Sequence, residues 1–227
     1  GGCGDTSPYV KGTRDPRFYR DVIYHGAPYR SNKNESKTIN TASGSDKIGA
    51  TKATTTGYYL RKFQQESWNK SGNFSINAPA IWRLPEFIYI YAEACNEVNP
   101  SAPNNIKYLD LVRDRAGIPG YKKLHDTGKK IDVIGDYEAQ AYAIRRERQV
   151  ELFSEGQRYF DIRRWMIAED TDNRMMHGFE ITRNGERKTG RIIDTRQHTF
   201  RKAMYFYPIP YKETVKSPDL LQNPYYE

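Results

Sequence analysis

A helical pattern of apolar residues begins abruptly at residue 84. Apolar positions recur there at steps of three and four residues, which is the spacing of one stripe along a helix. Pro85 falls in the first turn, where proline is tolerated, and Asn99 and Pro100 mark the end. The pattern therefore predicts a helix from about residue 84 to residue 98 with the apolar stripe as its core side. The stripe consists of Leu84, Phe87, Ile88, Tyr91, Ala94, Cys95 and Val98.

Three further helices are predicted at about residues 104–116, 136–154 and 157–168. Gly117 and Gly156 stand where helices commonly end. Short connections within two successive helix pairs predict two antiparallel helical hairpins, the arrangement of tetratricopeptide-like arrays, although no clean repeat of about 34 residues is present. The expected fold class is mainly α, with tetratricopeptide-like helical hairpins, long irregular loops and a few short strands.

The first 80 residues have a different character, because turn-forming residues dominate and only short aromatic runs separate them. Residues 18–24 and 57–63 are predicted as short strands, and the aromatic segment 204–210 as a strand-like tail that its prolines end. A structureless stretch of this length is unusual inside a compact domain. We therefore predict two regions. Residues 1–80 form a loop-rich segment that packs on the helices and on a missing N-terminal half, and residues 81–227 form the helical region.

Composition narrows the class of protein. The chain has 227 residues, 13% of them aromatic, and a net charge of +8. Residues 1–70 hold 12 Lys and Arg against 6 Asp and Glu, whereas residues 71–227 are close to balance with 24 against 22. The excess charge therefore does not follow a helix face that could track phosphates, and we predict no nucleic-acid binding. No apolar run approaches the roughly 18 residues that span a bilayer.

Three glutamates share one face of the helix predicted at 136–154. Glu147, Glu151 and Glu155 are spaced four residues apart, so their like charges repel one another. Glu147 lies beside apolar positions, and a carboxylate there needs a cationic partner. The next helix supplies candidates, so we predict a structural network in which Arg158 or Arg164 bonds to Glu147 or Glu151. The alternative, in which paired carboxylates act as general acid and base, needs a substrate that no other feature indicates.

Motifs for catalysis or cofactor binding are missing from the sequence. It contains no phosphate-binding loop, nucleophile elbow or zinc-binding helix, and its four histidines are isolated. Cys3 and Cys95 match no zinc or redox spacing, and Cys95 is interpreted as a small core residue. The sequence therefore predicts no enzyme activity, no cofactor and no metal site.

Five segments, in order along the chain, resemble signatures of the SusD/RagB family. The most specific is residues 147–165, which is similar to ER-x-x-EL-x-x-EG-x-R-x-x-D-x-x-RW. One departure is Tyr225, where the family commonly has glycine, the residue best suited to a positive φ. The other segments are R-x-x-E…YAEA-x-NE at 83–97, R-x-RAG-x-P at 113–119, PIP at 208–210 and QNP at 222–224.

The resemblance implies a surface-exposed lipoprotein of the outer membrane of Bacteroidetes. Such a protein binds a nutrient glycan, an oligo- or polysaccharide, without cleaving it and passes it to a SusC-like TonB-dependent transporter. Family members are longer, so the chain is expected to be the C-terminal portion, with membrane attachment only through a lipid anchor absent from it. A peptide-capturing RagB-like protein and a general helical-hairpin protein-interaction module are the alternatives.

Candidate ligand-binding residues lie in the polar loops. Flat aromatic side chains stack on the apolar faces of sugars, and polar groups meet their hydroxyls. On this basis Tyr24, Tyr29, Arg30 and Trp68 are the predicted glycan-binding residues. The alternative for each aromatic residue is packing against the helices or the missing half.

Overall fold

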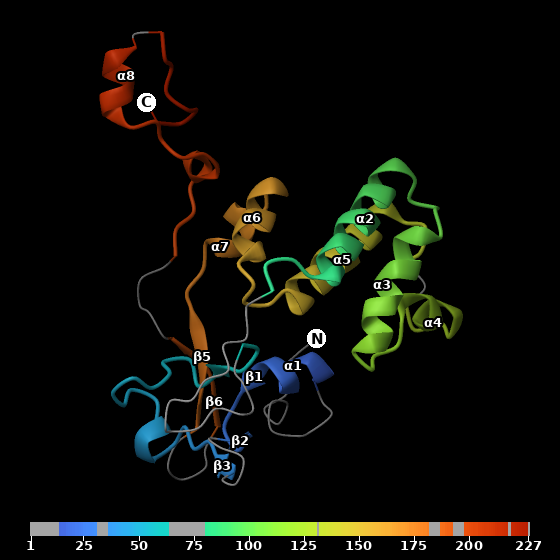
Figure 1. Ribbon diagram of the computed structural model, residues 1–227, viewed down its shortest axis with the longest axis vertical. Coiled ribbons are helices and arrows are strands. Elements are labelled where there is room, and N and C mark those ends of the chain that lie inside the picture. The colour runs from blue at the N-terminus through green and yellow to red at the C-terminus, as the bar shows by residue number, and fades with distance from the viewer. Residues whose placement is uncertain are drawn as a thin grey trace.

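Helices dominate the computed structural model, which confirms the mainly α fold class (Figure 1). The structure describes residues 14–30, 36–63, 80–130, 132–181, 187–192, 198–217 and 219–226. The helices in these ranges are α1 Pro16–Asp21, α2 Leu84–Val98, α3 Asn104–Arg115, α4 Tyr121–Asp126, α5 Tyr137–Glu151, α6 Gln157–Arg164, α7 Ala168–Asp172 and α8 Tyr211–Lys216. Two 3₁₀ turns cover Gly44–Asp46 and Lys202–Tyr205.

The strands in the described ranges are short and form three antiparallel pairs, β1 with β4, β2 with β3 and β5 with β6. Residues 18–24 are only partly a strand, because Pro16 and the capping Asp15 start helix α1 there. The strand-like tail is also wrong, since a 3₁₀ turn followed by irregular backbone occupies residues 204–210. The strands are β1 Val22–Ile23, β2 Pro28–Arg30, β3 Ser36–Thr38, β4 Tyr59–Leu60, β5 His177–Ile181 and β6 Arg187–Ile192.

Local signals explain where the long helices begin and end. The Asp136 carboxylate accepts a hydrogen bond of 2.8 Å from the backbone N–H of Ala139, which caps α5. Helix α2 carries Pro85 in its first turn and ends at Asn99. Gly156 adopts a φ of +79° immediately before α6, so the chain can turn sharply between α5 and α6.

The main core lies between α2, α3 and α5, with α2 packed against both of the others (Figure 1). Tyr89, Leu109 and Ile144 have no exposed surface. A smaller cluster around Ile23 and Ile39 lies in the loop-rich N-terminal region. The core therefore sits under the long helices, and the division of the chain near residue 80 stays a prediction.

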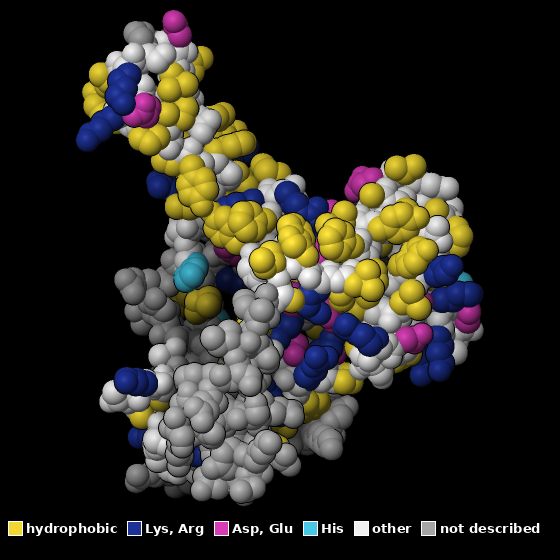
Figure 2. Space-filling view, viewed as in Figure 1, with side chains coloured by type: hydrophobic (Ala, Val, Ile, Leu, Met, Phe, Trp, Pro, Cys, Tyr) yellow, Lys and Arg dark blue, Asp and Glu magenta, His cyan; other side chains and the backbone are white. Residues whose placement is uncertain are grey.

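Helix α2 turns a different face to the core than its apolar stripe predicts. Leu84 is 72% exposed and Val98 87% exposed, whereas Glu86, Tyr89 and Asn96 are buried. Figure 2 shows hydrophobic side chains gathered on the outer surface of the helices. Cys95, predicted as a core residue, is only partly buried.

Polar partners on α5 explain why the other face of α2 is buried. The Gln140 side-chain amide donates a hydrogen bond of 2.9 Å to the Asn96 side chain, which itself donates to the Tyr137 carbonyl at 3.0 Å. Near the start of α2, Glu86 lies 3.9 Å from the Arg148 guanidinium. Because these partners satisfy the polar groups, a face that contains Glu and Asn can enter the core.

The final turn of the chain shows the consequence of the missing glycine. Tyr225 adopts a φ of +70°, the left-handed region that favours glycine. The final turn therefore keeps a positive φ although tyrosine stands where the family commonly has glycine. No helix in the described ranges has both the length and the apolar character that a bilayer span requires.

Leu109→Ala tests the position of the core. Leu109 is fully buried between helices, so its truncation should lower the free energy of unfolding by about 2–5 kcal/mol. Leu111, on the same helix, is 53% exposed, and Leu111→Ala should change that free energy by less than about 1 kcal/mol. Urea unfolding followed by circular dichroism measures both, and equal losses would contradict the assigned core.

Candidate functional site: a buried charge network and two surface hollows

Glu147 is the centre of a buried charge network. Its side chain is only 5% exposed and contacts guanidinium groups from two other helices. Arg17 of α1 donates a hydrogen bond of 2.8 Å to Glu147 Oε2, and Arg113 of α3 pairs with Oε1. The Tyr121 ring stacks under Arg113, with its centroid 4.2 Å from the guanidinium carbon. The carboxylate is therefore neutralised from two directions.

Glu151, one turn further along α5, is equally buried and has its own cations. Arg115 contacts Glu151 Oε1 at 2.6 Å, and Arg83 contacts the same oxygen at 3.1 Å. Arg83 also donates two hydrogen bonds to Glu155, at 2.9 Å and 2.6 Å. Lys62, which follows β4, reaches Glu155 at 2.6 Å. The network thus joins the N-terminal region to the helices.

The cations determine the protonation states in the network. Burial alone would raise the pKa of Glu151, but hydrogen bonds and charge from Arg115 and Arg83 hold that pKa below its ordinary value. The same balance lowers the pKa of Glu155, where Arg83 and Lys62 are the partners. Burial would also lower the pKa of Arg17, but Asp15 and Glu147 raise it. These groups stay charged at neutral pH.

The predicted partners of the glutamates are wrong. Arg164 bonds instead to Glu93, at 2.6 Å and 2.7 Å, and to Asp161 at 3.0 Å. Arg158 forms no ion pair with Glu147 or Glu151. The physical reason is the direction of α5, whose acidic face is turned toward α1, α3 and the start of α2, while α6 begins beyond its end (Figure 1).

Sequence reasoning missed the actual partners because they are distant along the chain. Two of the signals were nevertheless visible. Arg83 opens the first family-like segment, and Arg113 and Arg115 belong to the R-x-RAG segment. Arg17 and Lys62 lie in the loop-rich region, and no local pattern marks them as partners of α5. The structure does not favour the acid–base alternative, because the lowered pKa values of Glu151 and Glu155 make either residue a poor proton donor at neutral pH.

Of the four predicted ligand residues, the structure describes the side chains of Tyr24 and Tyr29. Tyr24 stacks on Phe18 with ring centroids 5.7 Å apart, and both Tyr24 and Tyr29 pack against the cluster around Ile23. The Arg30 backbone lies in β2, opposite Ser36, and its side chain lies outside the described part of the molecule. Trp68 also lies outside the described residues. Their role in ligand binding stays a prediction.

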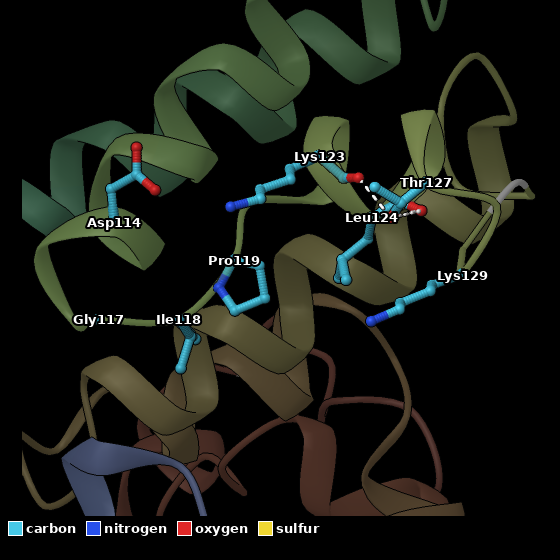
Figure 3. Close-up of a pocket in the computed structure, with 8 residues that line it drawn as sticks. All are labelled: Asp114, Gly117, Ile118, Pro119, Lys123, Leu124, Thr127 and Lys129. Carbon is cyan, nitrogen blue, oxygen red and sulfur yellow. Dashed lines mark hydrogen bonds between the residues drawn. The ribbon is translucent and has the colours of Figure 1, made fainter.

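The first surface hollow lies between the end of α3 and α4, with a volume of about 490 Å³. Figure 3 shows Lys123 and Lys129 on its α4 side and Ile118 and Pro119 in the loop that follows α3. The Thr127 hydroxyl caps the end of α4 by donating to the Lys123 carbonyl at 2.8 Å. This open hollow offers two amino groups beside a small apolar wall.

The second hollow lies at the turn between α5 and α6 and has a volume of about 420 Å³. Arg148 and Asp161 line its inner side and bond to each other at 2.7 Å. Leu152 and Phe153 supply apolar surface, and Arg158 adds a second guanidinium.

No group of three or more metal-ligating side chains occurs among the described residues of the chain.

Comparison with protein families shows which family has this sequence pattern. The sequence model of the SusD family matches residues 6–226. The chain belongs to the SusD family. The family consists of binding proteins rather than enzymes. The charge network falls on the segments that resemble the family, with Glu147 and Glu151 on α5, Arg83 before α2 and Arg113 on α3.

Solved structures resemble the chain over nearly its whole length. A SusD-like protein from Bacteroides fragilis NCTC 9343 is 27% identical, with a TM-score of 0.78, and the alignment covers 96% of this chain and 40% of that protein. The protein BT4246 is 23% identical, with a TM-score of 0.70 and coverage of 97% and 39%. A SusD superfamily protein from Parabacteroides distasonis ATCC 8503 has the same fold at 17% identity, with a TM-score of 0.52 and coverage of 99% and 41%.

The chain spans about 40% of the length of the Bacteroides fragilis relative. A comparison with functionally curated proteins gives no significant match.

Glu151→Gln tests the charge network through pH. A folded-state pKa below that of the unfolded chain stabilises the fold above the unfolded pKa, and this stability is lost as the pH falls through the folded pKa. Wild-type protein should therefore lose more stability than Glu151→Gln between pH 7 and pH 3. At pH 7 the variant should be less stable by about 3 kcal/mol, because arginines lose their anionic partner.

Urea unfolding at several pH values measures this difference, and Glu138→Gln is the matched control. Glu138 lies on the exposed side of the same helix. Asp21 and Asp110 have pKa values that burial raises, which gives the opposite pH dependence, so only the difference between variants isolates Glu151. Parallel stability curves for wild type and Glu151→Gln would contradict the network.

Proposed function

We propose that the protein binds a nutrient glycan, an oligo- or polysaccharide, at the cell surface without cleaving it. The observation that carries this proposal is the match of the SusD family over residues 6–226. The fold agreement with the SusD-like protein from Bacteroides fragilis supports it. In this proposal the bound glycan passes to a SusC-like TonB-dependent transporter of the outer membrane, where the protein is held as a surface lipoprotein.

The described structure is compatible with a binding role in two respects. The charge network holds α1, α2, α3 and α5 in fixed positions relative to one another. Two hollows of about 490 Å³ and 420 Å³ open at helix ends outside that network. Both volumes fall in the range of roughly 300–1,000 Å³ that is typical of small-molecule sites.

Affinity electrophoresis of the full-length protein in gels that contain single polysaccharides tests the proposal. Migration should be retarded by at least one glycan and restored by an excess of the matching free oligosaccharide. Thin-layer chromatography of the same mixtures should show no shorter products. A protein of similar size and charge without glycan affinity is the control for sieving.

Two outcomes would overturn this function. Retardation by no glycan in a broad panel, together with binding to peptides, would favour a peptide-capturing protein of the RagB type. Release of shorter sugars from a bound glycan would contradict a role in binding alone. Copurification with a large outer-membrane barrel tests the transporter separately.

A further inference from the structure

The wall of the hollow between α5 and α6 carries an excess of positive charge. Arg148 and Arg158 contribute two positive charges to its wall, and Asp161 contributes one negative charge. Asp161 is already held by Arg148 at 2.7 Å and by Arg164 at 3.0 Å. Its carboxylate is therefore bonded to other groups and attracts Arg158 only from beyond ion-pair distance.

Arg158 has no anionic partner among the described residues of the chain. It is half-buried, and no carboxylate lies within ion-pair distance of its guanidinium. Asp172 attracts it only from beyond that distance, and burial lowers the pKa of Arg158. By contrast, the buried Arg17 and Arg113 each contact a carboxylate. A half-buried guanidinium without a protein partner keeps donors that can meet water or an anionic ligand.

Arg148 provides a second, independent indication of a ligand. Its side chain is only 4% exposed, and its Nε and Nη2 atoms bond to Asp161 and Gln157. Its Nη1 atom is buried and has no hydrogen-bond partner, although Arg148 lines the hollow. Buried polar atoms in proteins are nearly always satisfied. The unsatisfied donor therefore leaves Arg148 with hydrogen-bonding capacity that its protein partners do not use.

The start of α6 forms another part of the same wall. Gly156 to Tyr159 line the hollow, and they include the first turn of this eight-residue helix. No side chain caps the turn and no acidic residue lies in it. The backbone N–H groups and the dipole at a helix N-terminus favour an anion. Two guanidinium groups and this helix end thus converge on one hollow.

We propose that this hollow binds the carboxylate of an acidic sugar, a uronic acid unit within a glycan. The proposal deepens the glycan-binding function and rests on it. A carboxylate matches the paired donors of a guanidinium better than a neutral hydroxyl does. Gln149, Gln157 and Ser154 in the wall can meet the sugar hydroxyls, and Leu152 and Phe153 can meet its C–H surface. The hollow is large enough for one sugar unit, and the other units of the glycan extend into solvent.

Isothermal titration calorimetry with α-1,4-linked trigalacturonate and its methyl ester tests the site. The two ligands share ring shape and hydroxyls and differ in charge, so full-length wild-type protein should prefer the acid by at least about tenfold. Arg158→Gln should lower the affinity for the acid by about tenfold or more and leave that for the ester unchanged. Arg158→Lys, which keeps the charge, should retain part of the preference.

Arg146→Gln is the matched control, since Arg146 is an exposed residue of α5 that lines neither hollow. Circular dichroism and thermal unfolding establish that the variants fold. Equal binding of acid and ester, or an unchanged affinity in folded Arg158→Gln, would overturn the inference. Binding of neutral glycans alone would overturn it and leave the proposed function standing, whereas binding of no glycan would overturn both. Preferential, Arg158-dependent binding of N-acetyl-trialanine would assign the site to a peptide carboxylate.

Discussion

The buried acidic face of α5 is the constraint on which the rest of the structure depends. Carboxylates with the low exposure of Glu147 and Glu151 cannot enter a protein interior without nearby cations. The cations come from α1, from α3 and from the residue before α2. The acidic face can therefore be buried only when these three elements lie against it. The network therefore couples α1 to the three helices that form the main core.

Arginine, rather than lysine, supplies most of these contacts for a geometric reason. A guanidinium presents several donors in one plane and can serve two carboxylates at once, as Arg17 does with Asp15 and Glu147. Arg83 does the same with Glu151 and Glu155. Such forks fix the distance and direction between elements, whereas an apolar contact leaves both adjustable. The polar contact of Asn96 with Gln140 fixes the other end of the α2–α5 interface in the same way.

The sequence predicted the long helices and the family well, because periodicity, glycine turns and capping residues are local signals. It predicted the wrong core face of α2, where Leu84 and Val98 are exposed and Asn96 is buried. Burial of Asn96 depends on Gln140, which is 44 positions away, and no local pattern reports that contact. The partners of Glu147 were missed for the same reason, since Arg17 is 130 positions away. Binding residues were harder still to predict, because the local sequence around a tyrosine does not show whether its side chain is exposed or packed.

The two kinds of arginine in this protein are distinguished by their surroundings rather than by their sequence. Carboxylates raise the pKa of Arg83 and Arg164, and these side chains hold the frame together. Burial lowers the pKa of Arg158, which Asp172 and Asp161 attract only from beyond ion-pair distance. Both kinds lie in family-like segments, so a signature alone does not separate structural from ligand-binding charge. The separation follows from position, because the frame arginines face the acidic side of α5 or its helical neighbours, whereas Arg158 lines a hollow that opens where α5 ends.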